Sequence, residues 1–204
     1  MKNNLQELYG NIDIYLFDQL LKGRFDNCKK ILDAGCGGGR NIIYFLHNGF
    51  EVYGTDQNPQ AIETVKNLSQ TLAPNNSLEN FVVCNVEDMP FANDYFDVVI
   101  SSAVFHFAYS HSHFDKMVRS VWRVLKPGGY LFARLASTIG IEELVTPLGD
   151  GRYLLPDGSE RFLVDEEVLH TYAHSLNGEL YEPIKTTNVQ NLRCMTTWCL
   201  RKKG

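Results

Sequence analysis

The sequence predicts a doubly wound α/β fold, in which helices cover both faces of a mostly parallel β-sheet. Aliphatic runs at 31–33, 50–55, 79–84, 96–102 and 130–135 are interspersed with segments of helical periodicity. The run at 96–102 contains continuous Val and Ile at 98–100, with no alternation, which is typical of a strand covered on both faces. Together these patterns favour strand–helix units wound around one parallel sheet.

Composition limits the class of protein. At 204 residues and 44% hydrophobic content, the chain can build one full core, so we expect a single domain over residues 1–204. A net charge of −5, with a short basic stretch only at 201–203, argues against a nucleic-acid partner. Five scattered cysteines without a CxxC pair predict neither a disulfide framework nor a zinc site, which fits a reducing cytoplasm. No apolar run approaches the roughly 20 residues that span a bilayer, so no membrane association or signal peptide is expected.

The first 25 residues predict one or two amphipathic helices. Apolar residues recur at near-helical spacing from Leu5 to Leu21. This pattern requires burial of one face, which is satisfied equally by a helix covering the sheet and by a lid over a ligand. For a lid over residues 1–25, Tyr9 and Tyr15 are candidate substrate contacts. Both interpretations stay open at this point.

The segment ILDAGCGGGRN, residues 31–41, predicts a buried strand that enters a glycine turn and opens a helix. Glycine is needed where the backbone takes positive φ and where a ligand approaches the main chain closely. The dinucleotide fingerprint GxGxxG would place a small residue at position 40, where this chain has Arg40. The turn therefore predicts a nucleotide-like ligand but does not match a nicotinamide site.

An acid follows the second strand. Asp56 lies about 20 residues beyond the glycine turn, which is the usual place of a carboxylate that accepts hydrogen bonds from ribose hydroxyls. The alternative is a helix N-cap ahead of Pro59, although Asn58 is equally suited to that task. We favour the ribose role for Asp56.

The fourth strand ends beside the first in a doubly wound sheet, so residues 101–106 are expected at the crevice. Ser101 and Ser102 are therefore ligand candidates, and His106 is a candidate on the substrate side. His111 and His113 follow nearby, but no carboxylate or thiolate completes a recognisable ligand set, and no metal site is predicted.

The second half of the chain continues with a helix over 114–125, the turn Lys126–Gly129 and an apolar strand that contains Arg134. An arginine in a buried strand needs a partner, either an acid or an anionic substrate. Residues 137–164 have little periodicity and predict an insertion on the substrate side. Arg152 and Arg161 in this insertion either clamp an oxyanion or lie in solvent.

The chain closes with a helix over 165–176 and an antiparallel hairpin of strands 180–187 and 191–201. Together with this hairpin, the acidic-x-Gly-x-Gly-x-Gly motif at 33–39 and RVLKPGGYL at 123–131 resemble the class I S-adenosylmethionine (SAM)-dependent methyltransferases. This resemblance implies a Rossmann-like, mostly parallel seven-stranded sheet that ends in the antiparallel hairpin. The motif GCGGGRN and the ending LRKK look like the tellurite-resistance methyltransferase group.

The resemblance implies SAM as cofactor, S-adenosylhomocysteine as product, and a role for each motif. Asp33 and the backbone of 35–37 would hold the methionine part, and Arg40 its carboxylate. Asn85 replaces the usual aspartate at the adenine, and its amide oxygen still accepts a hydrogen bond. The implied cofactor-binding residues are Asp33, Gly35, Cys36, Gly37, Arg40, Asp56, Gln57, Asn85, Val86, Glu87, Ser101 and Ser102.

The implied reaction is methyl transfer from SAM to a small-molecule nucleophile, which is an oxyanion, a thiol, a carboxylate or an amine. Because SAM carries its own activation, alignment and exclusion of water suffice for catalysis. A nucleophile that must lose a proton would use His106 as base, whereas an anionic one would be oriented by Arg134, Arg152 or Arg161. The alternatives are a non-catalytic SAM-binding regulator and a nicotinamide-dependent oxidoreductase. The expected assembly is a monomer or a homodimer.

Overall fold

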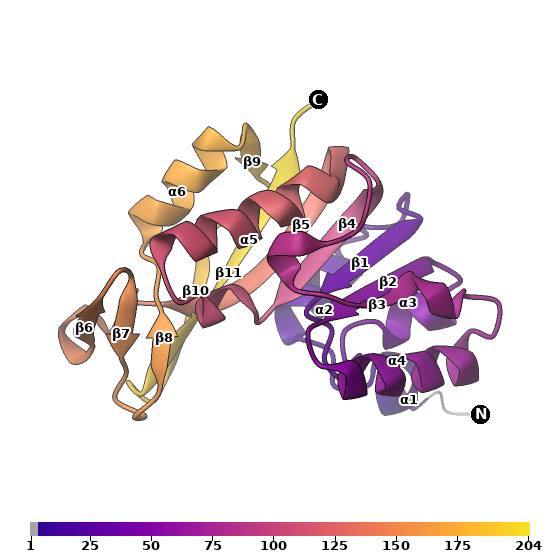
Figure 1. The fold of residues 1–204 in the computed structure, drawn as a ribbon, viewed down its shortest axis with the longest axis horizontal. Helices are drawn as coiled ribbons and strands as arrows, with labels where there is room; N and C mark the ends of the chain where they lie inside the picture. Colours follow the sequence, from indigo (N-terminus) through magenta and orange to yellow (C-terminus); the bar gives the residue numbers. More distant parts are fainter. Residues whose placement is uncertain (1–3) are drawn as a thin grey trace.

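A computed structural model describes residues 4–204 (Figure 1), so residues 1–3 of the predicted lid lie outside the described part. The central sheet has the strand order β10-β11-β5-β4-β1-β2-β3, and β9 pairs with β11. Its strands are β1 (Lys30–Ala34), β2 (Glu51–Asp56), β3 (Phe81–Val83), β4 (Phe96–Ser102), β5 (Leu125–Ser137), β9 (Gly178–Leu180), β10 (Lys185–Val189) and β11 (Arg193–Lys202). Strands β1 to β5 run parallel, while β9, β10 and β5 pair with β11 antiparallel. The predicted fold is confirmed, and β9 adds an eighth strand.

Helices cover both faces of this sheet. They are α1 (Leu5–Tyr9), α2 (Ile14–Leu21), α3 (Ile43–His47), α4 (Pro59–Leu72), α5 (His111–Val124) and α6 (Glu166–Ser175), with short 3-10 turns that include η2 (Val86–Asp88) and η3 (Phe105–Phe107). Figure 1 shows α5 and α6 over the same face of the sheet. Among the described helices, none is long and apolar enough to cross a membrane.

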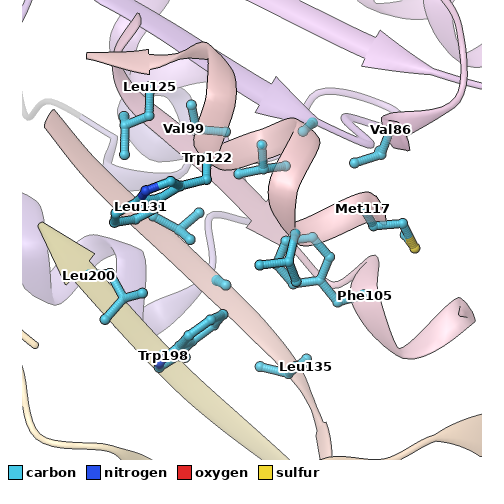
Figure 2. Close-up of a cluster of buried hydrophobic side chains, with 14 of the residues drawn as sticks. Val86, Val99, Phe105, Met117, Trp122, Leu125, Leu131, Leu135, Trp198 and Leu200 are labelled. Atoms are coloured by element: carbon cyan, nitrogen blue, oxygen red, sulfur yellow. The ribbon is translucent and has the colours of Figure 1, made fainter. Parts of the chain in front are cut away.

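Each face of the sheet has its own hydrophobic core, because alternate residues of each strand point to opposite sides. On the α5 and α6 face, Val99, Trp122 and Trp198 belong to one buried cluster (Figure 2). On the other face, Val98 and Ile100 pack with residues of α2, α3 and α4. All three β4 residues are fully buried, as the continuous apolar pattern of this strand predicts.

The turn Lys126–Gly129 lies within β5 and not ahead of the strand as predicted, because strand pairing already begins at Leu125 and resumes after a register shift. Gly129 is required there. A Cβ on Gly129 would lie 2.9 Å from the Asp97 carbonyl oxygen, and backbone cannot yield as a flexible side chain does. The turn is therefore structural, as its sequence indicates.

Residues 137–164 contain a three-stranded antiparallel sheet of β6 (Thr146–Gly149), β7 (Arg152–Leu154) and β8 (Glu160–Phe162). Strands of three or four residues are too short to produce a readable alternation, so the sequence shows little periodicity there. Figure 1 shows this small sheet projecting at one end of the molecule. Phe162 anchors it, with its ring stacked 4.8 Å from that of Phe114 in α5.

The predicted strand 180–187 is divided into β9 and β10 in the structure. Pro183 lacks an N–H group and therefore cannot continue a hydrogen-bonded ladder. The hairpin turn follows Val189, and Gln190 and Asn191 both have positive φ, of 54° and 58°. The antiparallel ending of the sheet is thus as expected, with one interruption.

Candidate functional site

A cavity of about 490 Å³ lies at the carboxyl ends of β1 to β4, the edge at which doubly wound sheets bind ligands. Six of the predicted cofactor residues line it. The lining consists of Gly35, Asp56, Gln57, Cys84, Asn85, Val86, Glu87, Ala103, Val104, Phe107, Tyr109, His113 and Met117. Asp33, Cys36, Gly37, Arg40, Ser101 and Ser102 do not belong to this lining.

The glycine turn presents bare backbone to this region. Gly35 has φ +83°, and a Cβ there would lie 2.3 Å from Cγ2 of Val104. Gly37 has φ +51° and faces open space, since no heavy atom of the described residues lies within 4 Å of a Cβ built on it. Any side chain at Gly37 would reduce this space and would also strain the backbone.

Asp56 is oriented by two backbone donors. The N–H of Gly37 donates to its Oδ2, and the N–H of Asn58 donates to its Oδ1, both at 2.9 Å. Asn58 itself caps α4, because its Oδ1 accepts from the N–H of Gln60 at 3.0 Å. The capping task therefore falls to Asn58. Each carboxylate oxygen of Asp56 keeps a lone pair that is directed by fixed geometry, and the side chain lines the cavity.

Asp33 is fully buried at the end of β1, and neither of its carboxylate oxygens has a hydrogen-bond partner in the described part of the chain. Burial raises the pKa of Asp33 to about 7; nearby Asp56 raises it further, while Arg40 lowers it. A buried carboxyl group without a partner destabilises the ligand-free protein. A bound ammonium group would supply this partner, although the lining residues must shift for it to reach Asp33.

The carboxylate of Asp13 was not among the predicted site residues. It contacts Arg40, Ser102 and Arg134. Nη1 of Arg134 donates to Oδ2 of Asp13 at 2.9 Å, and Oγ of Ser102 donates to the same oxygen at 3.1 Å. Nη2 of Arg40 lies 3.7 Å from this oxygen and donates to Oγ of Ser102 at 3.3 Å. We call Asp13, Arg40, Ser102 and Arg134 the Asp13 cluster.

The Asp13 cluster contains the partner that an arginine in a buried strand requires. Of the two partners considered, the structure contains the acid, and Asp13 is fully buried against it. Asp13 also caps α2, since its Oδ1 accepts from the N–H of Tyr15 at 3.0 Å. An aspartate directly before an apolar helix was a visible capping signal. Its pairing with a residue 121 positions away had no local signal.

His106 lies in η3, is buried and does not line the cavity. Burial lowers its pKa to about 4, with a further lowering by Arg161 and Arg193, so the imidazole is neutral at pH 7 and a weak base. Its neighbour Phe107 lines the cavity instead. The structure therefore does not favour the general-base role expected for His106, because the apolar surroundings disfavour the protonated form.

The other substrate candidates also lie away from the cavity lining. Tyr9 stacks on Tyr44 at 5.5 Å, and the Tyr15 hydroxyl lies 2.6 Å from Oγ1 of Thr187. Arg152 forms an exposed ion pair with Glu160, at 2.7 Å, within the small sheet. The guanidinium carbon of Arg161 lies 5.2 Å from the centre of the ring of Phe107, which lines the cavity.

The N-terminal helices differ in their attachment. Leu16 and Gln19 of α2 are buried, and Lys22, just beyond α2, pairs with Glu182 at 2.8 Å, so α2 covers a sheet face. Helix α1 buries no residue among those described and contacts α3 through the stacked ring of Tyr9. Helix α2 therefore corresponds to the first of the two interpretations, a helix that covers the sheet.

One part of the cavity wall was missed by sequence reasoning. It consists of Phe107, Tyr109, His113 and Met117, from η3 and the start of α5. His113 had been considered only as a metal ligand. In residues 4–204, no group of three or more His, Cys, Asp or Glu side chains is arranged to hold a metal ion. The available signal was the aromatic segment FHFAY directly after the fourth strand.

The family model described as "Methyltransferase domain" matches residues 32–133, half of the chain, and spans the glycine turn, Asp56 and the cavity wall. The chain belongs to this family. The methyltransferase is 34% identical over 102 residues to an uncharacterized methyltransferase of Synechocystis, covering 50% of this chain and 44% of the relative. It is 37% identical over 122 residues to mouse thiol S-methyltransferase TMT1B, covering 57% and 47%. The chain thus spans less than half the length of these curated relatives.

Solved methyltransferase structures share the fold over nearly the whole chain. The N1-methyltransferase of 1,6-didemethyltoxoflavin from Burkholderia thailandensis, with bound S-adenosylhomocysteine, has a TM-score of 0.69 at 17% identity and covers 98% of this chain and 82% of its own. TehB from Haemophilus influenzae has a TM-score of 0.67 at 20% identity and covers 94% and 63%. The predicted class I SAM-dependent methyltransferase family is confirmed, and with it SAM as the family's cofactor.

The residues of this methyltransferase fit SAM. The open space at Gly37 admits a ligand against the main chain, and Asp56 presents oriented acceptors at the cavity. The unpartnered carboxyl group of Asp33 suits the ammonium group of the methionine part. These observations concern the donor set and agree with the family assignment.

Proposed function

We propose that this methyltransferase transfers the methyl group of SAM to a small-molecule nucleophile. The observation that carries the proposal is the cavity at the carboxyl edge of the sheet, which joins bare glycine backbone to a backbone-oriented Asp56. Its volume of about 490 Å³ lies in the range of sites that enclose a cofactor-sized ligand.

Several residues at the carboxyl edge of the sheet bind the cofactor in this proposal. Asp56 accepts from the ribose hydroxyls, with Gln57 beside it, and Asn85 and Val86 contact adenine. Gly37 leaves room for the sulfonium end, and Asp33 receives the ammonium group. Arg40, whose side chain is 49% exposed, is the more loosely paired cation of the Asp13 cluster and would bind the cofactor's carboxylate. When bound, SAM supplies an activated methyl group, so the protein contributes alignment and exclusion of water.

The geometry favours acceptors that are anionic before they bind. His106 is buried, neutral at pH 7 and outside the cavity lining, so it is poorly placed to remove a proton. In this proposal the one excess positive charge of the Asp13 cluster is matched by the carboxylate of SAM. The cation left for the acceptor is Arg161, whose guanidinium carbon lies 5.2 Å from the centre of the Phe107 ring. Thiolates, oxyanions and carboxylates are therefore proposed ahead of amines, and the likeness to a thiol S-methyltransferase supports a thiolate among them.

Two measurements test the function. Calorimetry should show S-adenosylhomocysteine binding to the full chain. Radiolabelled SAM, offered with a panel of thiols, oxyanions, amines and carboxylates, should then show turnover, highest for an ionised acceptor. Binding without turnover across the panel would indicate a SAM-binding regulator. Binding of NADH without any S-adenosylhomocysteine binding would reject the proposal in favour of an oxidoreductase.

We further propose that the enzyme acts in the cytoplasm as a monomer or a homodimer. The scattered cysteines fit a reducing compartment, since all five are free thiols in the structure. Light scattering coupled to gel filtration would measure the mass of the assembly against 23.2 kDa for one chain.

A further inference from the structure

A side-chain bridge joins two elements at the adenine end of the cavity. Nε2 of His113, in the first turn of α5, lies 3.1 Å from Oε1 of Glu87 in η2. Both residues line the cavity, and their side chains are 11% and 22% exposed. The ring of Tyr109 stacks on the imidazole at 4.0 Å, with an angle of 24° between the planes.

The second partner of the imidazole determines where its proton lies. The backbone N–H of Tyr109 donates to Nδ1 of His113 at 3.3 Å, so Nδ1 carries the lone pair and Nε2 carries the proton. Nε2 therefore donates to Glu87. The start of the helix holds His113 in place, because Oγ of Ser110 accepts from its backbone N–H at 3.0 Å. A neutral donor thus orients the carboxylate without neutralising it.

Asn85 explains why a second acceptor is needed. It stands where the resembling methyltransferases have an aspartate, and its side chain does not cap η2. An amide presents either an oxygen or an NH₂ group after a flip, so it does not distinguish a ring amino group from other substituents. A carboxylate only accepts. Glu87 lines the same end of the cavity, and its Oε2 has no hydrogen-bond partner within residues 4–204.

We propose that Glu87 selects the 6-amino group of the cofactor's adenine by accepting its hydrogen bond, and that His113 is the positioning residue that aims Glu87. This inference rests on the proposed function, because it requires adenine to bind beside Asn85 and Val86. It assigns to α5 a part in the choice of cofactor.

The test compares two ligands that differ only in this amino group. They are S-adenosylhomocysteine and its desamino analogue, in which hydrogen replaces the 6-amino group while the ring nitrogens stay unchanged. Calorimetry on the full chain gives the preference as the ratio of the two dissociation constants. His113→Leu should weaken the binding of S-adenosylhomocysteine by roughly tenfold, the scale of one charge-assisted hydrogen bond. The dissociation constant of the analogue should stay unchanged.

Matched variants separate positioning from general damage. His113→Gln should recover most of the preference, because its amide again offers a donor to Glu87. His111→Leu is the control, since His111 contacts the ring of Phe162 and does not line the cavity. Glu87→Ala removes the acceptor without altering α5, and it tests the proposal even if His113→Leu fails to fold.

Several results would overturn this inference. If His113→Leu weakens the binding of both ligands equally, His113 has only a structural role in the cavity wall. A preference lost in Glu87→Ala but kept in His113→Leu would reject the positioning role, and a preference kept in both would reject the whole inference. If the unaltered chain binds no S-adenosylhomocysteine, the proposed function itself is wrong.

Discussion

At the scale of single residues, neighbouring side chains divide the tasks of structure and binding. Asp56 and Asn58 are both suited to cap α4, yet Asn58 makes the capping hydrogen bond. Asp56 is held by the N–H groups of Gly37 and Asn58 and lines the cavity. Because backbone donors fix its orientation, Asp56 would make the proposed contact with ribose without reorganising.

Replacing Asp56 by alanine should weaken S-adenosylhomocysteine binding by about 1 to 3 kcal/mol, the scale of hydrogen bonds to a charged acceptor. Calorimetry measures this change. Asn58→Ala is the matched control, and it should lower the free energy of unfolding by about 1 kcal/mol through the lost cap while leaving the dissociation constant unchanged. An unaltered dissociation constant in Asp56→Ala would contradict the ribose assignment.

Asp33 shows how a proposed binding residue lowers the stability of the ligand-free protein. Its pKa is raised by burial from the ordinary value of 3.8 to about 7. Between these pH values the folded state binds a proton that the unfolded state has lost. The contribution of Asp33 to the free energy of unfolding therefore falls as the pH rises from about 4 to about 7 and then stays level.

Asp33→Asn should remove this dependence. The variant should be more stable than the unaltered protein at pH 8 and should differ less from it at pH 5, in urea unfolding of the ligand-free chains. The same variant should bind S-adenosylhomocysteine more weakly, because it lacks the acceptor for the ammonium group. Equal stability differences at the two pH values would show that Asp33 does not titrate as proposed.

At the scale of elements, the N-terminal segment is attached to the sheet edge by one buried carboxylate. Asp13 caps α2 and pairs with Arg134, while its own N–H donates to Oδ1 of Asn41 at 3.0 Å. Arg40 and Asn41 of the glycine-turn motif thus contact the segment that precedes α2. Helix α2 is therefore connected, through Asp13, to the glycine-turn motif that forms part of the crevice.

Asp13→Ala should lower the free energy of unfolding by about 3 kcal/mol, because it removes a helix cap and leaves Arg134 without its partner. Asp18→Ala is the control on the same helix. Its exposed ion pair with Lys22, at 2.7 Å, should contribute less than about 1 kcal/mol. Urea unfolding measures both, and equal effects of the two variants would argue against a special role for Asp13.

At the scale of the whole molecule, the segment after α2 and the C-terminal strands are linked by charge. Glu182, between β9 and β10, accepts from Nζ of Lys22 at 2.8 Å and from Nζ of Lys185 at 3.0 Å. Burial alone would raise the pKa of Glu182, but these hydrogen bonds lower it to about 2. The linkage therefore stabilises the protein while Glu182 is ionised.

The sign of this contribution gives a pH prediction. For a carboxyl group with a lowered pKa, the stabilisation is present above its ordinary value of 4.5 and is lost as the pH falls towards about 2. Glu182→Gln should therefore be less stable than the unaltered protein at pH 7, and the gap should close in acid. Glu179→Gln, on the exposed face of β9, should leave stability unchanged at both pH values. A gap that is constant with pH would contradict the linkage.

Much of the fold was predictable because its signals are local. The continuous apolar run of β4, the glycine turn after β1 and the caps of the helices each lie within a few residues. The small sheet of β6 to β8 was not predictable, since its short strands leave no periodic pattern. The division of β9 from β10 depended on Pro183, whose effect on the ladder is seen only once the pairing with β11 is known.

The sequence alone determined that a nucleoside-binding crevice would form, because the glycine turn and Asp56 are specified by residue type and spacing along one strand–helix–strand unit. Only the tertiary structure decided which side chains face that crevice. Arg134 turned to Asp13, His106 was buried beside Phe107, and His113 came to orient Glu87. The reason is physical: backbone turns and periodicity are encoded locally, whereas these partners meet only after the sheet has packed segments that are far apart in the chain.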